Sequence, residues 1–203
     1  MSSSVPLPQT SVFVTKGFVD IESEARAAGW HLPPDLESAH KSRQTEWLAS
    51  RLCLSEAFRA RGVHLDPQQI RFIDHQQIED EAGFRFSFSH TRDCAGCWLL
   101  DARAESQNAS LRIGLDIEPV NRKLTAAAGA RLNLLGETLS DLERWCLREA
   151  IFKALPASEQ ARFTGSKIEA TRGEFTIQPL ARRGFFHLER GVTLLSAFAW
   201  SNG

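Results

Sequence analysis

Two acidic side chains stand two positions apart in an otherwise apolar segment of this chain. Residues 111–120 read Leu-Arg-Ile-Gly-Leu-Asp-Ile-Glu-Pro-Val and predict a strand, so Asp116 and Glu118 share one face. Neighbouring carboxylates repel each other and lose hydration when they are partly buried. A divalent cation removes both penalties, and oxygen ligands suit Mg²⁺ or Mn²⁺ rather than zinc. The alternative interpretation is the solvated face of an edge strand.

A third carboxylate and an ammonium group lie on a predicted helix farther along the chain. The sequence Ser140-Asp-Leu-Glu is a capping-box pattern that opens a helix, and Pro156 ends it after about residue 155. Trp145, Glu149 and Lys153 recur at i, i+4 and i+8, so they share one face of that helix. An exposed Glu149–Lys153 ion pair of ~0.3–0.5 kcal/mol is the alternative interpretation.

His90 follows the clearest strand pattern in the chain. In residues 84–89, Phe alternates with Arg and Ser, which predicts a strand with one aromatic, buried face. An imidazole at the end of such a strand, beside Ser89, can donate a hydrogen bond to a phosphate oxygen. A histidine in an ordinary turn is the alternative, and the other five histidines show no spacing pattern.

Composition and charge exclude several classes of protein. The 203 residues are 42% hydrophobic and 24% charged, which suits one compact domain or two small halves sharing a core. A net charge of -1 lacks the basic footprint of a nucleic-acid-binding protein. No apolar run approaches the ~20 residues of a membrane-spanning helix, and residues 1–6 do not resemble a signal peptide. We therefore expect a cytoplasmic protein that binds neither nucleic acid nor membrane.

The four cysteines indicate neither a zinc site nor a disulfide framework. Cys94-Ala-Gly-Cys97 is the one motif-like spacing, and zinc would need a second pair of ligands. A redox motif is the weaker alternative. We interpret these residues as small side chains of a strand over 94–100, in a reducing compartment.

The remaining patterns favour an α+β fold, because helices and strands do not alternate as they do in βαβ units. Pro33-Pro34-Asp35 predicts a helix start with Asp35 as N-cap and a helix over about 36–61 that stops at Gly62. Residues 1–10 read as a loose arm, and 124–139 as helix or loop. Further strands are predicted at 70–72, 174–178, 185–189 and 192–200, and 84–89 should form a hairpin with 94–100.

Several motifs occur together in a characteristic order. They are Arg43-Gln-Thr-Glu46-Trp-Leu-Ala-Ser-Arg51, Ser89-His90, Gly114-Leu-Asp116-Ile-Glu118 and Trp145-Cys-Leu-Arg148-Glu149-Ala-Ile-Phe-Lys153. Over roughly residues 40–155 this series resembles the 4'-phosphopantetheinyl transferase superfamily, in its two-repeat, monomeric branch that activates siderophore and peptide synthetases. Arg148 replaces the usual Lys, Ser50 replaces the usual Gly, residues 74–81 lack a G-K-P-like segment, and 119–144 is short. These departures bear mainly on the choice of partner.

The resemblance implies a fold, a reaction and a partner. Two similar α+β halves, here 1–110 and 111–203, would pack as a pseudo-dimer around a cleft that holds coenzyme A. The enzyme would be a monomer that moves the phosphopantetheine arm of coenzyme A to a serine of an apo acyl or peptidyl carrier protein. Adenosine 3',5'-bisphosphate would be released.

The resemblance also implies roles for individual residues. Asp116, Glu118 and Glu149 would bind one Mg²⁺, or Mn²⁺, that bridges the pyrophosphate, which makes Asp116 part of the coenzyme site as well. Glu149 would draw off the serine proton, and Lys153 would hold a phosphate oxygen. The remaining coenzyme ligands would be Ser89 and His90, together with Arg43 and Arg51 for the 3'-phosphate. Two alternatives are a non-catalytic relative that binds a carrier protein or a nucleotide, and a Mg²⁺-dependent phosphoesterase.

Overall fold

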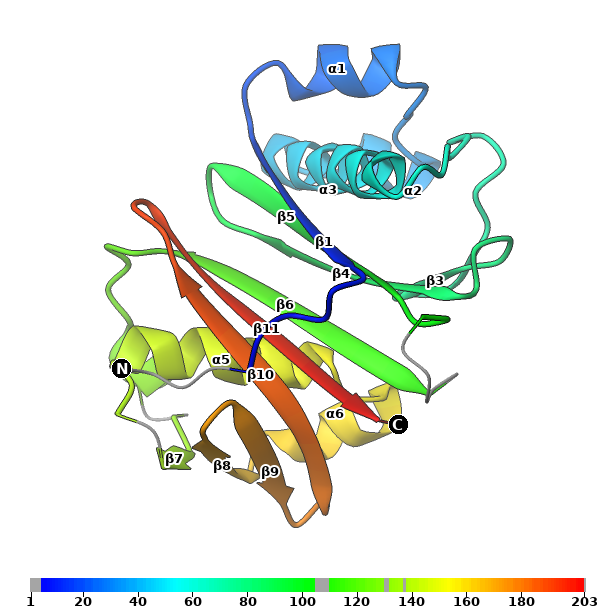
Figure 1. Ribbon diagram of the computed structural model, residues 1–203. Helices are drawn as coiled ribbons and strands as arrows, with labels where there is room; N and C mark the ends of the chain where they lie inside the picture. Colours follow the sequence, from blue (N-terminus) through cyan, green and yellow to red (C-terminus); the bar gives the residue numbers. More distant parts are fainter. Residues whose placement is uncertain (1–4, 105–109, 130–131, 137, 203) are drawn as a thin grey trace. The chain divides into compact units, whose positions relative to one another are not determined.

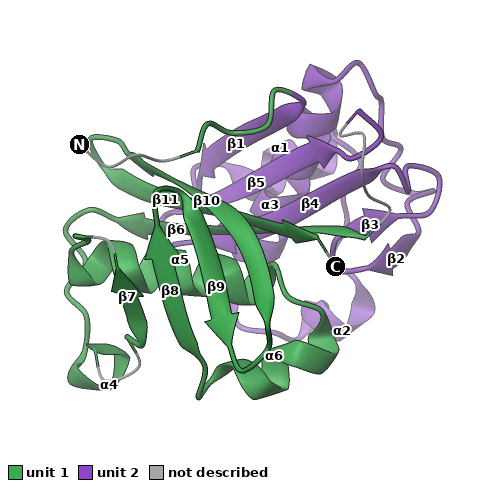
Figure 2. Ribbon diagram, turned by 60° about the horizontal axis from the view of Figure 1, so that its bottom comes forward, with its two compact units in different colours: residues 1–9, 105–203 green, residues 10–104 purple. Residues whose placement is uncertain are grey.

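A computed structural model describes residues 5–104, 110–129, 132–136 and 138–202 of the chain. The chain divides into two compact units, Thr10–Ala104 and Met1–Gln9 with Glu105–Gly203 (Figure 2). Both units combine helices and antiparallel strands, which confirms the mixed α+β class. None of the described helices is both long and apolar enough to cross a membrane.

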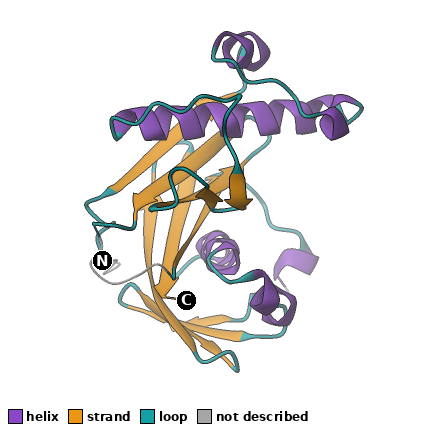
Figure 3. Ribbon diagram, turned by 90° about the vertical axis from the view of Figure 1, so that its right-hand side faces the viewer, coloured by secondary structure: helices purple, strands orange, loops and turns teal. Residues whose placement is uncertain are grey.

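The unit Thr10–Ala104 is built on a three-stranded antiparallel sheet in the order β1-β5-β4 (Figure 1). Helix α3 packs along one face of that sheet, as Figure 3 shows for the long helix. The elements of the unit are β1 (Ser11–Gly17), α1 (Ile21–Ala27), α2 (Pro34–Glu37), α3 (Lys41–Ala60), β2 (Phe72–Asp74), β3 (Gln77–Ile78), β4 (Phe84–His90) and β5 (Cys94–Asp101).

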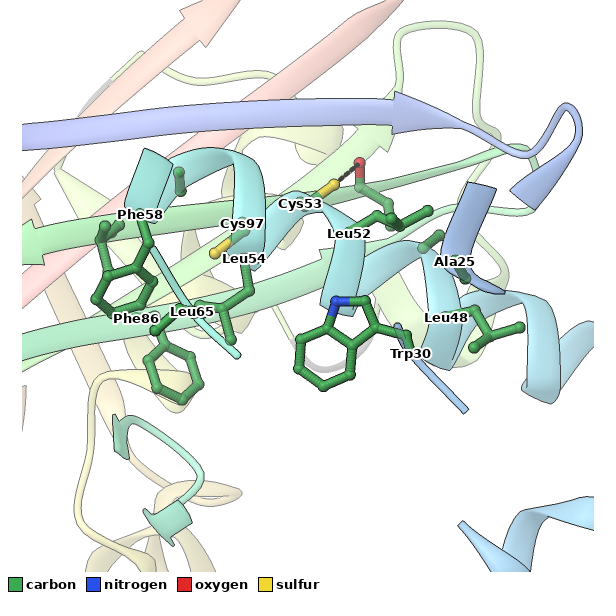
Figure 4. Packing of buried hydrophobic residues seen from close by; sticks show 14 of the residues in the cluster. Ala25, Trp30, Leu48, Leu52, Cys53, Leu54, Phe58, Leu65, Phe86 and Cys97 are labelled. Carbon is green, nitrogen blue, oxygen red and sulfur yellow. Dashed lines mark hydrogen bonds between the residues drawn. The ribbon is translucent and has the colours of Figure 1, made fainter. Parts of the chain in front are cut away.

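The core of this unit lies between α3 and the sheet (Figure 4). Helical periodicity puts Leu48, Leu52 and Phe58 on the buried side of α3, and the Phe58 ring meets that of Phe84 on β4 with centroids 5.0 Å apart. Cys53 donates a hydrogen bond from Sγ to the carbonyl oxygen of Ala95 over 3.6 Å. All four cysteines are free thiols.

The second unit is built on a six-stranded sheet in the order β6-β11-β10-β9-β8-β7. All neighbours are antiparallel except β7 and β8. Helix α5 packs on β6 and β11 (Figure 1). The elements of the unit are β6 (Leu111–Pro119), α4 (Ala126–Gly129), β7 (Leu134–Gly136), α5 (Asp141–Lys153), α6 (Ala157–Phe163), β8 (Lys167–Thr171), β9 (Glu174–Gln178), β10 (Arg182–Arg190) and β11 (Leu194–Asn202).

The two units repeat one order of elements. In each, a strand is followed by a long helix and then by a hairpin, and the first strand pairs with the last strand of the hairpin. The series β1-α3-β4-β5 thus corresponds to β6-α5-β10-β11. The boundary between 110 and 111, and the packing of two halves around a cleft, stay predictions.

The predicted helix over 36–61 is wrong at its start. Residues 34–37 form the separate helix α2, in which Asp35 lies inside the first turn after Pro33, so Asp35 is not the N-cap. Helix α3 begins at Lys41, where the His40 ring accepts the backbone N–H of Ser42 over 3.3 Å. By contrast, both reciprocal bonds of the capping box at Ser140 are present, which confirms that helix start.

An ion pair joins α6 to the sheet of the second unit. Glu159 and Arg182 form a bidentate contact, with Arg182 Nε 3.0 and 2.8 Å from the two carboxylate oxygens. The guanidinium holds the pKa of Glu159 below its ordinary value, chiefly through this hydrogen bonding. We expect Arg182→Ala to lower the free energy of unfolding by about 1–2 kcal/mol at pH 7, measured by urea denaturation.

The same ion pair should make stability depend on pH. Because folding lowers the pKa of Glu159, its contribution is complete above the ordinary value of 4.5 and is lost as the pH falls through the folded value. The difference in free energy of unfolding between the wild type and Arg182→Ala should therefore become smaller at acidic pH. A difference that stays constant from pH 7 to pH 3 would contradict this assignment.

Candidate functional site

A close backbone approach sets helix α5 against strand β6. A Cβ atom built on Gly114 would lie 1.9 Å from the carbonyl oxygen of Ala150 and 2.7 Å from the nitrogen of Ala154. Glycine is therefore the residue that lets this turn of α5 rest directly on the strand. Cys146, one helical turn before Ala150, donates from Sγ to the carbonyl oxygen of Asp116 over 3.4 Å. The small residues on this helix face thus bring α5 alongside the acidic strand.

Asp116 and Glu118 lie on the face of β6 that α5 covers, and each is only 6% exposed. The residues opposite them on β11 are Ala197 and Leu195, which offer no polar group from their side chains. Burial among apolar neighbours disfavours an uncompensated charge. The exposed-strand alternative for these two carboxylates is therefore wrong.

Lys153, in the last turn of α5, reaches the first of these carboxylates. Its Nζ lies 2.9 Å from Asp116 Oδ1 and 2.8 Å from the carbonyl oxygen of Leu115. The helix thus supplies a cation to the strand, as the shared face of residues 145, 149 and 153 predicts. The lysine is held beside a carboxylate, in a partly buried position.

Two donors from different elements converge on Glu118. The indole Nε1 of Trp145 donates to Glu118 Oε1 over 3.1 Å, and the guanidinium of Arg122 pairs with the same oxygen. Arg122 also stands over the Trp145 ring, with its Cζ 5.7 Å from the ring centroid. The sequence analysis did not identify Arg122, which lies in the turn after β6.

The surroundings of Glu149 disfavour its ionised form. Burial raises its pKa first, and repulsion from Asp116 raises it further, while Arg148 acts in the opposite direction. The guanidinium of Arg148 lies 3.2 Å from Glu149 Oε1 and is itself buried, with its Cζ 4.8 Å from the Phe163 ring centroid. Glu149 and Asp116 are thus close enough to repel, as two carboxylates beside one cation would be.

The chemistry of these groups fits a hard divalent cation. Two buried carboxylates and a third that repels one of them supply oxygen ligands of the kind that such a cation prefers. Within the described ranges, however, no group of three or more His, Cys, Asp and Glu side chains is positioned to hold one metal ion. The carboxylates are instead paired with Lys153, Arg122 and Arg148. Ligation by Asp116, Glu118 and Glu149 stays a prediction.

The other predicted ligands belong to the unit Thr10–Ala104. His90, at the end of β4, places Nε2 3.5 Å from Glu46 Oε2, and Arg43 NH1 lies 3.7 Å from the same oxygen. Strand β4 and helix α3 therefore bring His90 and Arg43 to the carboxylate of Glu46. The sequence analysis assigned no role to Glu46. Ser89 is buried in β4.

Arg51 lies in an aromatic surround on the same helix. Its Cζ stands 4.8 Å from the ring centroids of Trp47 and Phe72 and 4.9 Å from that of Phe88. Burial lowers the pKa of Arg51 to about 10, so its guanidinium stays charged at neutral pH. These stacking contacts join α3, β2 and β4 around one cation. A role for Arg51 in binding the 3'-phosphate stays a prediction.

No protein-family model matches the chain, and no curated protein matches it either.

Proposed function

We propose that this chain is a Mg²⁺-dependent 4'-phosphopantetheinyl transferase acting on an acyl or peptidyl carrier protein. The observation that carries the proposal is the contact of α5 with β6. Across the close approach at Gly114, Glu149 and Lys153 stand beside Asp116, in the order and spacing of the motifs that resemble this superfamily.

The order of elements in the two units supports the same proposal. A fold of two similar halves accounts for the correspondence of β1-α3-β4-β5 with β6-α5-β10-β11. We propose that the halves pack as a pseudo-dimer with coenzyme A between them. Ser89, His90, Arg43 and Arg51 then come from one half, and the carboxylates come from the other.

The residues of α5 suit the chemistry of phosphoryl-group transfer. A bound Mg²⁺ would neutralise the pyrophosphate charge and stabilise the leaving group. Glu149 would accept the proton of the carrier serine. Lys153, an ammonium already held at Asp116, would bind a phosphate oxygen.

Incubation with coenzyme A, Mg²⁺ and a panel of apo carrier proteins tests the proposal. We expect one carrier serine to gain the mass of one phosphopantetheine, detected by intact-protein mass spectrometry, with release of adenosine 3',5'-bisphosphate. Release of phosphate or nucleotide without a carrier protein would favour the phosphoesterase alternative. Binding of coenzyme A without transfer to any carrier would favour the non-catalytic one.

His90→Ala should weaken coenzyme A binding without unfolding the protein. The His90 side chain is 40% exposed, so little packing is lost, whereas one donor to a phosphate or ribose oxygen disappears. We expect roughly a 10- to 100-fold rise in the Kd from calorimetry in Mg²⁺, from a contact of ~1.5–3 kcal/mol. His64→Ala, in an exposed position of the same unit, is the matched control. If His90→Ala lowered the melting temperature of the ligand-free protein but left the Kd unchanged, the role of His90 would be structural.

A further inference from the structure

Arg51 on helix α3 is a cation whose N–H groups have no acceptor in the described part of the chain. Its Nε is buried and has no hydrogen-bond partner, and no hydrogen bond or ion pair joins its guanidinium to another described residue. Three aromatic rings shield the group from water, with centroids 4.8, 4.8 and 4.9 Å from its Cζ. A shielded guanidinium with five unused donors is costly, so a bound anion would stabilise it.

The side chains around Arg51 leave an excess of positive charge. Arg43, Trp47 and Arg51 recur every four residues and so share one side of α3. Arg43 is close enough to Arg51 to repel it. The carboxylate of Glu46 is already shared by Arg43 and His90, at 3.7 and 3.5 Å. This side of the helix therefore favours an anion such as a phosphate group.

Phe72 on β2 adds an exposed aromatic surface beside that charge. Its ring packs against Phe86, with centroids 6.0 Å apart, and against the guanidinium of Arg51. These contacts hold the ring in place, yet the residue remains 40% exposed. A ring that is both fixed and exposed is a surface on which a planar group of a ligand stacks.

A nucleoside phosphate would use both features at once. Inorganic phosphate would supply acceptors to Arg51 but would leave the Phe72 ring exposed. An apolar peptide would cover the ring but would leave the guanidinium without an acceptor. A nucleotide carries a flat base and an anionic group in one molecule, so it matches the ring and the cation together.

We propose that Phe72 and Arg51 form a base-stacking site for a nucleoside phosphate, in which the base lies on the Phe72 ring and a phosphate oxygen accepts from Arg51. Phe72 then determines specificity, because it distinguishes a nucleotide from a phosphate without a base. The inference rests on the proposed function for coenzyme A as the natural nucleotide. The stacking itself requires only residues of the unit Thr10–Ala104.

Strand β2 offers a matched pair of variants. Phe72→Leu removes the ring but keeps an apolar side chain. Ile73→Ala removes apolar surface at the next position, where the residue is 56% exposed and alternation along the strand directs it to the opposite side. Any general effect of lost apolar surface on β2 is common to both variants, so their difference reports the ring.

Calorimetric titration with adenosine 3',5'-bisphosphate tests the inference. We expect Phe72→Leu to raise the Kd roughly tenfold, and Ile73→Ala to change it less than about twofold. Equal Kd values for wild type and Phe72→Leu would overturn the inference, and so would an absence of binding by the wild type. Binding that depends on Phe72, without transfer of phosphopantetheine to any carrier protein, would overturn the proposed function and leave the inference standing.

A second measurement needs no substitution at Phe72. Adenosine 5'-monophosphate and ribose 5-phosphate both carry one phosphate, and only the first carries a base. We expect the wild type to bind the nucleotide at least about tenfold more tightly, from NMR titrations that follow the backbone amides of β2. Equal affinities for the two probes would show that the base is not recognised, contrary to the proposal.

Discussion

Glu149→Gln should reduce transfer of phosphopantetheine by about 10²- to 10⁴-fold while the protein stays folded. The amide keeps the shape of the side chain but removes the group proposed to take the serine proton and one proposed oxygen ligand of the metal. Burial and the charge of Asp116 both raise the pKa of Glu149, so its ionised form costs free energy in the fold. Replacing it with a neutral amide should therefore leave the melting temperature nearly unchanged. Single-turnover rates on an apo carrier protein and thermal unfolding measure the two effects.

A matched control separates this effect from a general loss of acidic charge. Glu169, on β8 of the same unit, forms an exposed pair with Lys167 over 3.2 Å. Glu169→Gln should transfer at the wild-type rate. If Glu149→Gln also retained near-normal turnover, both the metal role and the base role of Glu149 would be refuted.

Gly114→Ala should both destabilise the second unit and impair transfer. The new methyl group would meet backbone atoms of α5 at 1.9 and 2.7 Å, and a backbone cannot rotate away as a side chain can. The helix must shift on the strand, at a cost of about 1–3 kcal/mol. Because Glu149 and Lys153 move with α5, while Asp116 stays on β6, we expect transfer to fall about 10²-fold even where the protein is folded. Urea denaturation and single-turnover transfer measure the two losses.

Gly165→Ala is the control for this substitution. Gly165 belongs to the same unit, and a Cβ atom there meets nothing within 4 Å. Gly165→Ala should change the free energy of unfolding by less than about 0.5 kcal/mol and should leave the transfer rate unchanged. A Gly114→Ala protein as stable and active as this control would mean that α5 tolerates displacement and that its position does not govern the site.

The parts of the fold that the sequence predicts best are those with strong local signals. Strand β6 and the start of α5 follow from hydrophobic alternation and from the capping box at Ser140, which depend only on nearby residues. Strand β1 was not predicted, because its partner β5 lies about 80 residues away and no turn joins the two. The start of α3 was misplaced, because the ring of His40 caps that helix, and imidazole is not a usual capping group.

Contacts within the site were predicted unevenly for a similar reason. Helical spacing indicated that Glu149 and Lys153 share a face, and the structure pairs Lys153 with Asp116. Arg122, the partner of Glu118, was not predicted, because the strand pattern ends at Pro119. A tight turn after Pro119 brings Arg122 back to Glu118. Arg51 lies one helical turn after Trp47, and this spacing predicts that the guanidinium stacks on the indole ring. The positive charge of Arg51 does not by itself predict that contact.

The position of β11 has a consequence for how the protein is made. This strand, Leu194–Asn202, lies between β6 and β10, so β6 gains its neighbour in the sheet only after β11 has left the ribosome. Until β11 has been synthesised, strand β6, with both acidic residues, lacks the antiparallel neighbour that it has in the folded unit. The unit Thr10–Ala104 contains all three strands of its own sheet and can pair them while the rest is still being synthesised. A nonsense codon just before β11 would therefore spare the sheet of the early unit and leave the acidic strand without its neighbour.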